Sequence, residues 1–367
     1  MFLEPESIEY ALLGGGLLGG GGGGWLEEGR KWAQAAFATG NKPRLISLDA
    51  LPADAVVATV SLVGSPAAKE RYCEPSDGVA AIELLAQRLG SRPTALITSE
   101  NGGAATVNGW FQSAAMGIPV VDAAANGRAH PLGVMGAMGL DLLADYRSLQ
   151  CAVGGNPRTG QRIALAVEGS VSSASDLVLH AAELAGGMVA VARNPVSPAY
   201  LKENAALGAI SMALELGQLI YTTHAQGGRA VAAALAKTLR GEIIVEGEVC
   251  EYALARRAGL DFGRVVIGDC ELVFWNEYLT LERHGRRLAT FPDLIATLDA
   301  RTGEPVVSAA VCRGMKLNCI SADKSSLRLG AGMRIEAHFR RLEEISGKEI
   351  VPYVFGPRSS CHAKASG

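Results

Sequence analysis

Two acidic residues come at the ends of predicted strands, where their side chains could take part in acid–base chemistry. Glu100 follows the apolar run 95–98, and Asp122 closes a run that begins at Pro119. Carboxyl groups can activate water or protonate a leaving group once burial moves their pKa towards neutrality. Acids in such positions also often accept hydrogen bonds from loop N–H groups, which is a structural role. We therefore predict Glu100 and Asp122 as catalytic residues, with capping as the alternative.

Two further polar side chains follow Asp122 along the chain. Arg128 could hold a carbonyl or carboxylate group by paired N–H donation, and we predict it as the third catalytic residue. Its alternative role is an ion pair with Asp122. His130 could act as a base near neutral pH, and we predict that it contacts the ligand.

A run of six glycines, Gly19 to Gly24, is the least ordinary feature of the chain. Ordering such a run costs much backbone entropy, so it is expected only where another group must approach closely or where N–H groups cradle an anion. No strand precedes it and no Gly-Lys-Ser/Thr follows, so the common nucleotide-binding motifs do not fit. We expect a helix over 5–13, an ordered loop and a second helix over 26–37. The predicted ligand-binding residues are Gly20, Gly21, Gly22, Gly23, Ser65, Asn101, Gly102, Gly103 and His130.

Strands and helices alternate in the first part of the chain, which predicts an α/β fold with a mostly parallel sheet covered by helices. Ligands bind beyond the carboxyl ends of the strands in such sheets. After residue 242, short strands separated by turns indicate an antiparallel sheet or barrel. The expected strands are 44–48, 56–63, 95–98, 119–122, 163–167 and 188–192, and the expected helices are 76–89, 104–116, 173–184, 198–220 and 230–239. The predicted units are an α/β domain over 1–165, a segment packing on it over 166–240, a β-rich domain over 241–358 and a tail over 359–367.

The composition limits the class of protein. The 367 residues are 49% hydrophobic and carry a net charge of −3, which speaks against nucleic acid or an anionic membrane as the main partner. Seven cysteines without a C-x-x-C pair, and acids rather than bases near the N-terminus, indicate a cytoplasmic protein. The sequence has no metal-ligand spacing, leaves any cofactor unknown and points to a small-molecule ligand. The Gly/Leu/Met-rich segment 131–143 could serve a homo-oligomer interface or ordinary core packing.

Several sequence blocks, taken in order, resemble one bacterial family. This family was long catalogued as a domain of unknown function and was later attached to S-methyl thiohydantoin desulfurase. The resemblance implies an α/β domain followed by a β domain, and a hydrolytic activity on a hydantoin or S-methyl thiohydantoin ring. Related domains occur fused to hydantoinase/oxoprolinase-type proteins. The blocks are 17–24, 100–103, 117–122, 127–131, 276–277, 291–295 and 302–305.

The chain also departs from the pattern of that family. Family members usually carry acids at the positions of Ala124, Leu132 and Trp25, an Asn at Ala105 and an aromatic residue at His130. The loss of carboxylates leaves open a non-catalytic, ligand-binding or accessory role in a hydantoinase-like assembly. A third alternative is a nucleotide-handling enzyme that uses the glycine loop for phosphate.

Three other residues could take part in the chemistry. Glu277 and Asp293 could face the α/β domain, although ending a strand is the expected role for each. Cys73 follows Arg71 closely and would be a nucleophile only if its pKa were lowered.

Overall fold

The computed structural model describes residues 1–65, 68–257 and 260–357, so the expected tail over 359–367 lies outside the described residues. The helices are α1 (Ser7–Gly19), α2 (Leu26–Ala38), α3 (Pro75–Leu89), α4 (Trp110–Met116), α5 (Val171–Leu184), α6 (Pro198–Asn204), α7 (Ala209–Thr223), α8 (Gly228–Leu239), α9 (Glu336–Ser346) and α10 (Val351–Phe355). The strands of the first sheet are β1 (Leu45–Ile46), β2 (Val57–Gly64), β3 (Ala95–Thr98), β4 (Val120–Ala124), β5 (Ser148–Gly154), β6 (Ile163–Gly169), β7 (Met188–Val196) and β8 (Ala206–Leu207). Those of the second are β9 (Glu242–Arg257), β10 (Leu260–Ile267), β11 (Cys270–Trp275), β12 (Glu277–Arg283), β13 (Arg286–Thr290), β14 (Leu294–Asp299), β15 (Pro305–Val306) and β16 (Lys316–Ala322).

The first sheet is mixed. Its order is β1-β4-β3-β2-β7-β5-β6, with β8 paired to β4. The pairs β1–β4, β4–β3 and β3–β2 are parallel, as the alternation of strands and helices predicted. The pairs β2–β7, β7–β5 and β5–β6 are antiparallel. Strand β5 was not among the strands predicted from the sequence. The short link between β5 and β6 can join antiparallel neighbours only, because a parallel pair needs a longer crossover.

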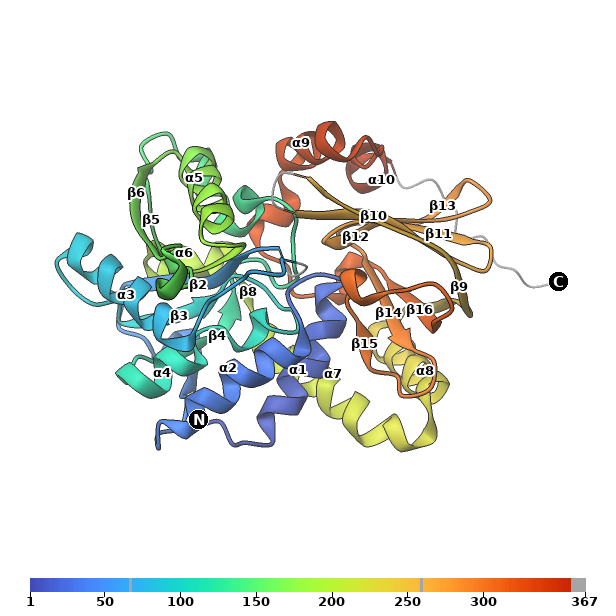
Figure 1. Cartoon of the computed structure of the whole chain (residues 1–367), viewed down its shortest axis with the longest axis horizontal. Helices are drawn as coiled ribbons and strands as arrows, with labels where there is room; N and C mark the ends of the chain where they lie inside the picture. The colour runs from blue at the N-terminus through green and yellow to red at the C-terminus, as the bar shows by residue number, and fades with distance from the viewer. Residues whose placement is uncertain (66–67, 258–259, 358–367) are drawn as a thin grey trace.

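The second sheet is antiparallel throughout, with the order β13-β12-β11-β10-β9-β16-β14-β15, which confirms a β-rich unit after the α/β unit. Figure 1 shows the two sheets side by side. The segment 166–240 contributes to both: β7 lies inside the first sheet, whereas Leu235 and Leu239 of α8 pack with Leu298 and Ile320 of the second. One apolar core cluster also combines Ile97 of the first sheet with side chains from the β-rich part.

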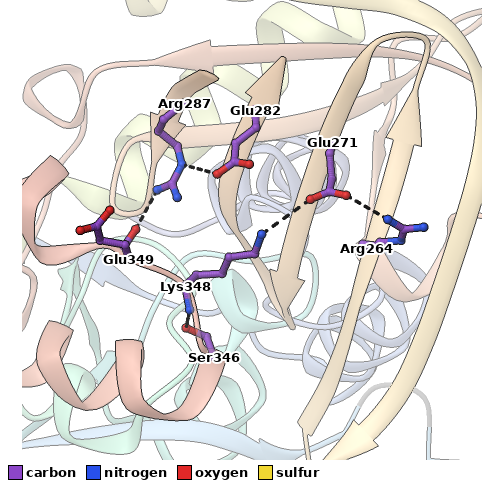
Figure 2. Close-up of polar contacts among 7 residues, drawn as sticks. All are labelled: Arg264, Glu271, Glu282, Arg287, Ser346, Lys348 and Glu349. Carbon is purple, nitrogen blue, oxygen red and sulfur yellow. Dashed lines mark hydrogen bonds and ion pairs between the residues drawn. The ribbon is translucent and has the colours of Figure 1, made fainter. Parts of the chain in front are cut away.

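The chain after α9 is tied to the outer strands of the second sheet by polar contacts (Figure 2). Arg287 forms an ion pair of 2.9 Å with Glu282 and donates to the carbonyl oxygen of Glu349 at 2.9 Å. Lys348 lies 3.6 Å from Glu271, which also pairs with Arg264. These contacts hold the C-terminal helices against the sheet.

Helix α1 is longer than expected, because it continues through Gly14, Gly15 and Gly16. Glycine is a poor helix former, and the sequence therefore predicted a break after residue 13. The helix persists because α1 packs closely against α7: a Cβ atom at Gly14 would lie 1.7 Å from the carbonyl oxygen of Ala213, and one at Gly217 would lie 1.7 Å from that of Tyr10. Tertiary packing thus overrides local preference.

Two other expected helices are interrupted. The one predicted over 198–220 is split into α6 and α7 by β8, which pairs with β4, and Gly208 adopts a φ of 73° at the break. The one predicted over 104–116 begins as a short 3-10 turn over 105–107, and α4 starts only after Gly109, whose φ is 92°. Across the described ranges, none of the helices has the length and apolar character needed to cross a membrane.

Candidate functional site at the junction of the two sheets

A cavity of about 150 Å³ lies where the two sheets meet. It opens beyond the carboxyl ends of β2 and β3, the edge at which ligands were expected. The β-rich part completes the wall with Leu260, Asn276 and Glu277. The polar side chains that line the cavity are Glu28, Ser99, Glu100, Asn108, Ser175, Asp176, His130, Arg193, Asn276 and Glu277.

The turn over residues 20–24 between α1 and α2, called the glycine turn below, contacts both parts of the chain. The carbonyl oxygen of Gly20 accepts a hydrogen bond from the N–H of Tyr278 at 2.8 Å, and that of Gly21 accepts from the N–H of Ser308 at 2.8 Å. On the other side, the carbonyl oxygen of Gly23 accepts from the N–H groups of Ala104 and Ala105, each at 3.0 Å. The turn therefore bonds to both units through its backbone.

The same turn leaves no room for side chains. A Cβ atom at Gly20 would lie 2.2 Å from Arg128, one at Gly22 would lie 2.0 Å from Glu277, and one at Gly23 would lie 2.4 Å from the Cα atom of Gly102. Of the predicted glycines, Gly23 lines the cavity, whereas Gly20, Gly21 and Gly22 pack behind its wall against Arg128, Tyr278 and Glu277. Close approach of other groups is therefore the feature that the glycines permit here.

Glu277 is a buried carboxyl group that the β-rich part directs into the cavity. It follows Asn276, which adopts a φ of 55° at the tight turn between β11 and β12 and accepts a hydrogen bond from the N–H of Asp261 at 2.9 Å. Asparagine tolerates this left-handed conformation better than most residues. Burial, reinforced by the charge of Glu100, raises the pKa of Glu277 well above its ordinary value, while Arg128 opposes the shift.

Glu100 and His130 face each other in the cavity. Their Oε2 and Nε2 atoms are 3.2 Å apart. Nδ1 of His130 lies 2.9 Å from the carbonyl oxygen of Leu132, so Nδ1 carries the proton and the neutral ring presents an unprotonated Nε2. Burial raises the pKa of Glu100 to about 8, against the charges of Arg193 and Arg128, and burial lowers the pKa of His130 to about 3. At neutral pH the pair thus holds its proton on Glu100.

Two buried guanidinium groups supply positive charge near these acids. Arg193, on β7, lines the cavity, and burial lowers its pKa while Glu100 opposes the shift. Arg128 donates to the carbonyl oxygens of Pro292 and Asp293, and its guanidinium carbon stands 4.8 Å from the centre of the Phe291 ring. Burial lowers the pKa of Arg128 to about 10, opposed by Glu277 and Asp293.

Three side chains around the cavity have a buried polar atom that lacks a hydrogen-bond partner among the described residues. These atoms are Oε2 of Glu28, Nε of Arg193 and Oε2 of Glu277. Buried polar atoms are nearly always paired in folded proteins, because each unpaired one costs free energy. Their gathering around one hollow is the arrangement of a site for a polar ligand.

Several predicted site residues lie elsewhere. Asp122 does not line the cavity: its carboxylate accepts from the N–H groups of Ile210 and Ser211 at 3.0 and 2.9 Å and so caps α7. The Ser65 hydroxyl donates to Asp261, away from this cavity. The side-chain amide of Asn101 donates to the carbonyl oxygens of Gly127 and Ala209, which is a structural role.

Gly102 and Gly103 are packed against the glycine turn and do not line the cavity. Arg128 likewise lies behind the wall, and it does not pair with Asp122. Of the expected contacts, Glu100, His130 and Gly23 therefore come together at the cavity itself.

Sequence reasoning missed Glu28 and Arg193 and undervalued Glu277. Glu28 lies in the first turn of α2, where acids are common because they interact favourably with the helix dipole. Arg193 comes one residue after the predicted strand 188–192 and lies within β7. An arginine in a buried strand is a usable signal, since such a charge requires a partner. The thiol of Cys73 is not activated, because burial raises its pKa well above the ordinary value.

Four of the positions at which the sequence was expected to depart from the family pattern divide into two groups. Ala105 and His130 line the cavity. Ala124 and Leu132 are buried in apolar clusters. Among the residues that the structure describes, no three or more His, Cys, Asp or Glu side chains are grouped so that they could hold a metal ion.

The fold and the cavity define a two-domain protein, α/β followed by β-rich, with a charged hollow at the junction. The chain belongs to the S-Me-THD-like family: the model of the N-terminal domain of that family matches residues 6–161, and the model of its C-terminal domain matches residues 169–335. No curated protein sequence matches the chain significantly.

A solved structure shares the fold. The X-ray crystal structure of a protein from Chromobacterium violaceum is 20% identical in sequence, covers 94% of this chain and 96% of its own, and superposes with a TM-score of 0.69. At 20% identity this similarity shows a shared fold over both domains.

Proposed function

We propose that the chain is an enzyme that hydrolyses a hydantoin- or S-methyl thiohydantoin-like ring, at the ring or at an exocyclic sulfur, in the cavity between the two domains. The observation that supports the proposal is the set of three unpaired buried polar atoms around one small cavity, together with the facing pair Glu100 and His130. A cavity of roughly 150 Å³ admits a small ring such as benzene. The family membership supports the choice of a thiohydantoin-like ring.

In the S-methyl case the reaction replaces a carbon–sulfur bond by a carbon–oxygen bond. Glu100, protonated at neutral pH, gives its proton to the ring nitrogen beside the sulfur-bearing carbon, which makes that carbon more electrophilic. Water adds to the carbon, the carbon–sulfur bond breaks, and a carbonyl group forms. The water gives up both protons: one leaves with the sulfur as methanethiol, and the other restores Glu100.

The other polar side chains have complementary roles in this proposal. Glu28 stands 3.5 Å from Arg71, and burial raises its pKa, which increases its basicity. It takes from the water the proton that then leaves with the sulfur as methanethiol. Burial raises the pKa of Glu277 well above its ordinary value, so its protonated form can donate a hydrogen bond to the ring carbonyl from its unpaired oxygen. The unpaired Nε of Arg193 is a second donor for the ring.

The test is turnover of S-methyl thiohydantoin and hydantoin by the purified full chain, followed by chromatography of the ring product and by release of methanethiol. Glu100→Gln should lower kcat by about 10²–10⁴-fold. Glu168→Gln, which changes an exposed carboxylate at the end of β6, is the matched control and should leave kcat unchanged.

The result separates the proposal from the two alternatives. Binding of the rings without turnover would favour a non-catalytic or accessory role. A thermal shift with ATP alone would overturn the ring proposal, because stabilisation reports the ligand that the folded state binds.

A further inference from the structure

A second, larger cavity lies beside the first. Its volume is about 780 Å³, and it shares two wall residues, Gly64 and Leu179, with the inner cavity of about 150 Å³. We call it the outer cavity and define it by Gly64, Ser65, Lys69, Leu179, Glu183 and Gly187. It lies at the end of β2, under α5 and beside the turn that precedes β7.

The wall of the outer cavity is bare backbone at Gly64 and Gly187. Gly64 has a φ of 144° and Gly187 a φ of 120°, conformations that side-chain-bearing residues rarely adopt. A Cβ atom at Gly64 would lie 2.0 Å from the carbonyl oxygen of Gly187, and one at Gly187 would lie 2.3 Å from the Cβ atom of Ala68. Of the shared pair, Leu179 is the residue that carries a side chain, and it stands at the boundary between the two cavities.

The outer cavity combines an apolar wall with polar groups of both signs. Leu179 and Ala182 come from one face of α5, and Lys69, Glu183 and Arg256 carry charges at the rim. Arg256 and Asp261 are 3.7 Å apart, and Asp261 accepts from the hydroxyl of Ser65 at 2.9 Å. Such a lining suits an aliphatic segment that ends in a neutral polar group able to donate and accept hydrogen bonds.

We propose that the outer cavity binds a substituent of the substrate whose ring occupies the inner cavity. The substrate class is then a five-membered cyclic amide or thioamide that carries an extended side chain with a polar end, such as a carboxamide. The inner cavity has room for little beyond the ring, and because the two cavities share Gly64 and Leu179, a substituent that leaves the ring on this side would enter the outer cavity. This inference rests on the proposed function for the identity of the ring.

The experiment compares three probes by titration calorimetry: the unsubstituted S-methyl thiohydantoin ring, the ring with a carboxamide-ended propyl chain, and the ring with an alkyl chain of equal length. The wild-type chain should bind the carboxamide compound about tenfold more tightly than the other two. Leu179→Trp should abolish this gain, and its effect on the Kd of the unsubstituted ring, whose cavity Leu179 also borders, should be smaller. Leu177→Trp is the matched control, because Leu177 lies on the same helix with 51% of its surface exposed and does not line the cavity.

Leu179→Phe gives a second, smaller obstruction should the tryptophan variant fail to fold, as judged by circular dichroism. Equal affinity of the wild-type chain for all three probes would overturn the outer-cavity proposal. So would equal weakening of all probes by the Leu179 variants. In both cases binding and turnover of the unsubstituted ring would leave the proposed function intact. If no ring compound binds, the proposed function fails and the substituent site falls with it.

Discussion

Replacing Gly22 by alanine is expected to displace the carboxyl group of Glu277. The added Cβ atom would lie 2.0 Å from Oε1 and 2.6 Å from Cδ of Glu277. To reach an ordinary contact of 3.4 Å the oxygen must retreat by about 1.4 Å. Gly22 does not have a positive φ, so alanine meets no backbone strain there and the effect is steric.

The expected cost has two parts. Overpacking a filled site costs about 1–3 kcal/mol of unfolding free energy. Misplacement of a positioned group by roughly 1 Å can lower turnover about 100-fold. Both are measurable in the full chain, the first by urea unfolding and the second as kcat/KM for S-methyl thiohydantoin.

Gly169→Ala is the matched control. Gly169 also lacks a positive φ, and a Cβ atom there would have nothing within 4 Å, so neither stability nor kcat/KM should change. In the double variant Gly22→Ala/Glu277→Ala the clash is gone, and the stability lost in Gly22→Ala should return although activity does not. A Gly22→Ala protein with wild-type stability and kcat/KM would refute the reasoning.

The remaining predictions concern acid–base chemistry and stability. Because the reaction needs the protonated form of Glu100, whose pKa burial raises to about 8, kcat/KM should fall as the pH rises through about 8, and a flat alkaline profile would contradict this assignment. Asp122→Ala should lose the cap of α7 and about 0.5–2 kcal/mol in urea unfolding. The kcat of this variant should stay unchanged. A large loss of kcat would instead indicate that Asp122 takes part in catalysis. Arg287→Met should cost about 1–3 kcal/mol, because its side chain is only 8% exposed and bonds Glu282. Glu271→Gln removes an ion pair whose side chains are about a third exposed, so it should change the free energy of unfolding by no more than about 1 kcal/mol in thermal or urea unfolding. Equal losses in the Arg287 and Glu271 variants would contradict the role of burial.

The pattern of the sequence was sufficient for the two-part architecture. The alternation of apolar strands and helices before residue 240 and the short strands after it reflect local periodicities of side-chain burial, which survive in the folded chain. The glycine run also predicted an ordered loop, because six consecutive glycines are costly to order unless other groups must approach the backbone closely. The strand-end position of Glu100 followed from the same periodicity.

Only the tertiary structure decided which acids face the cavity. Glu100 and Asp122 occupy similar positions in the sequence pattern, yet Asp122 is used by the N-terminus of α7, which lies 88 residues further along the chain at Ile210. Glu277 reaches the cavity because the backbone of the glycine turn bonds to the strand that carries it. These partners are distant in sequence, and contacts of that kind depend on how whole elements pack. Local propensity carries no information about them, which is why the approach of Glu277 to Glu100 and the position of Arg193 became visible only in the tertiary structure.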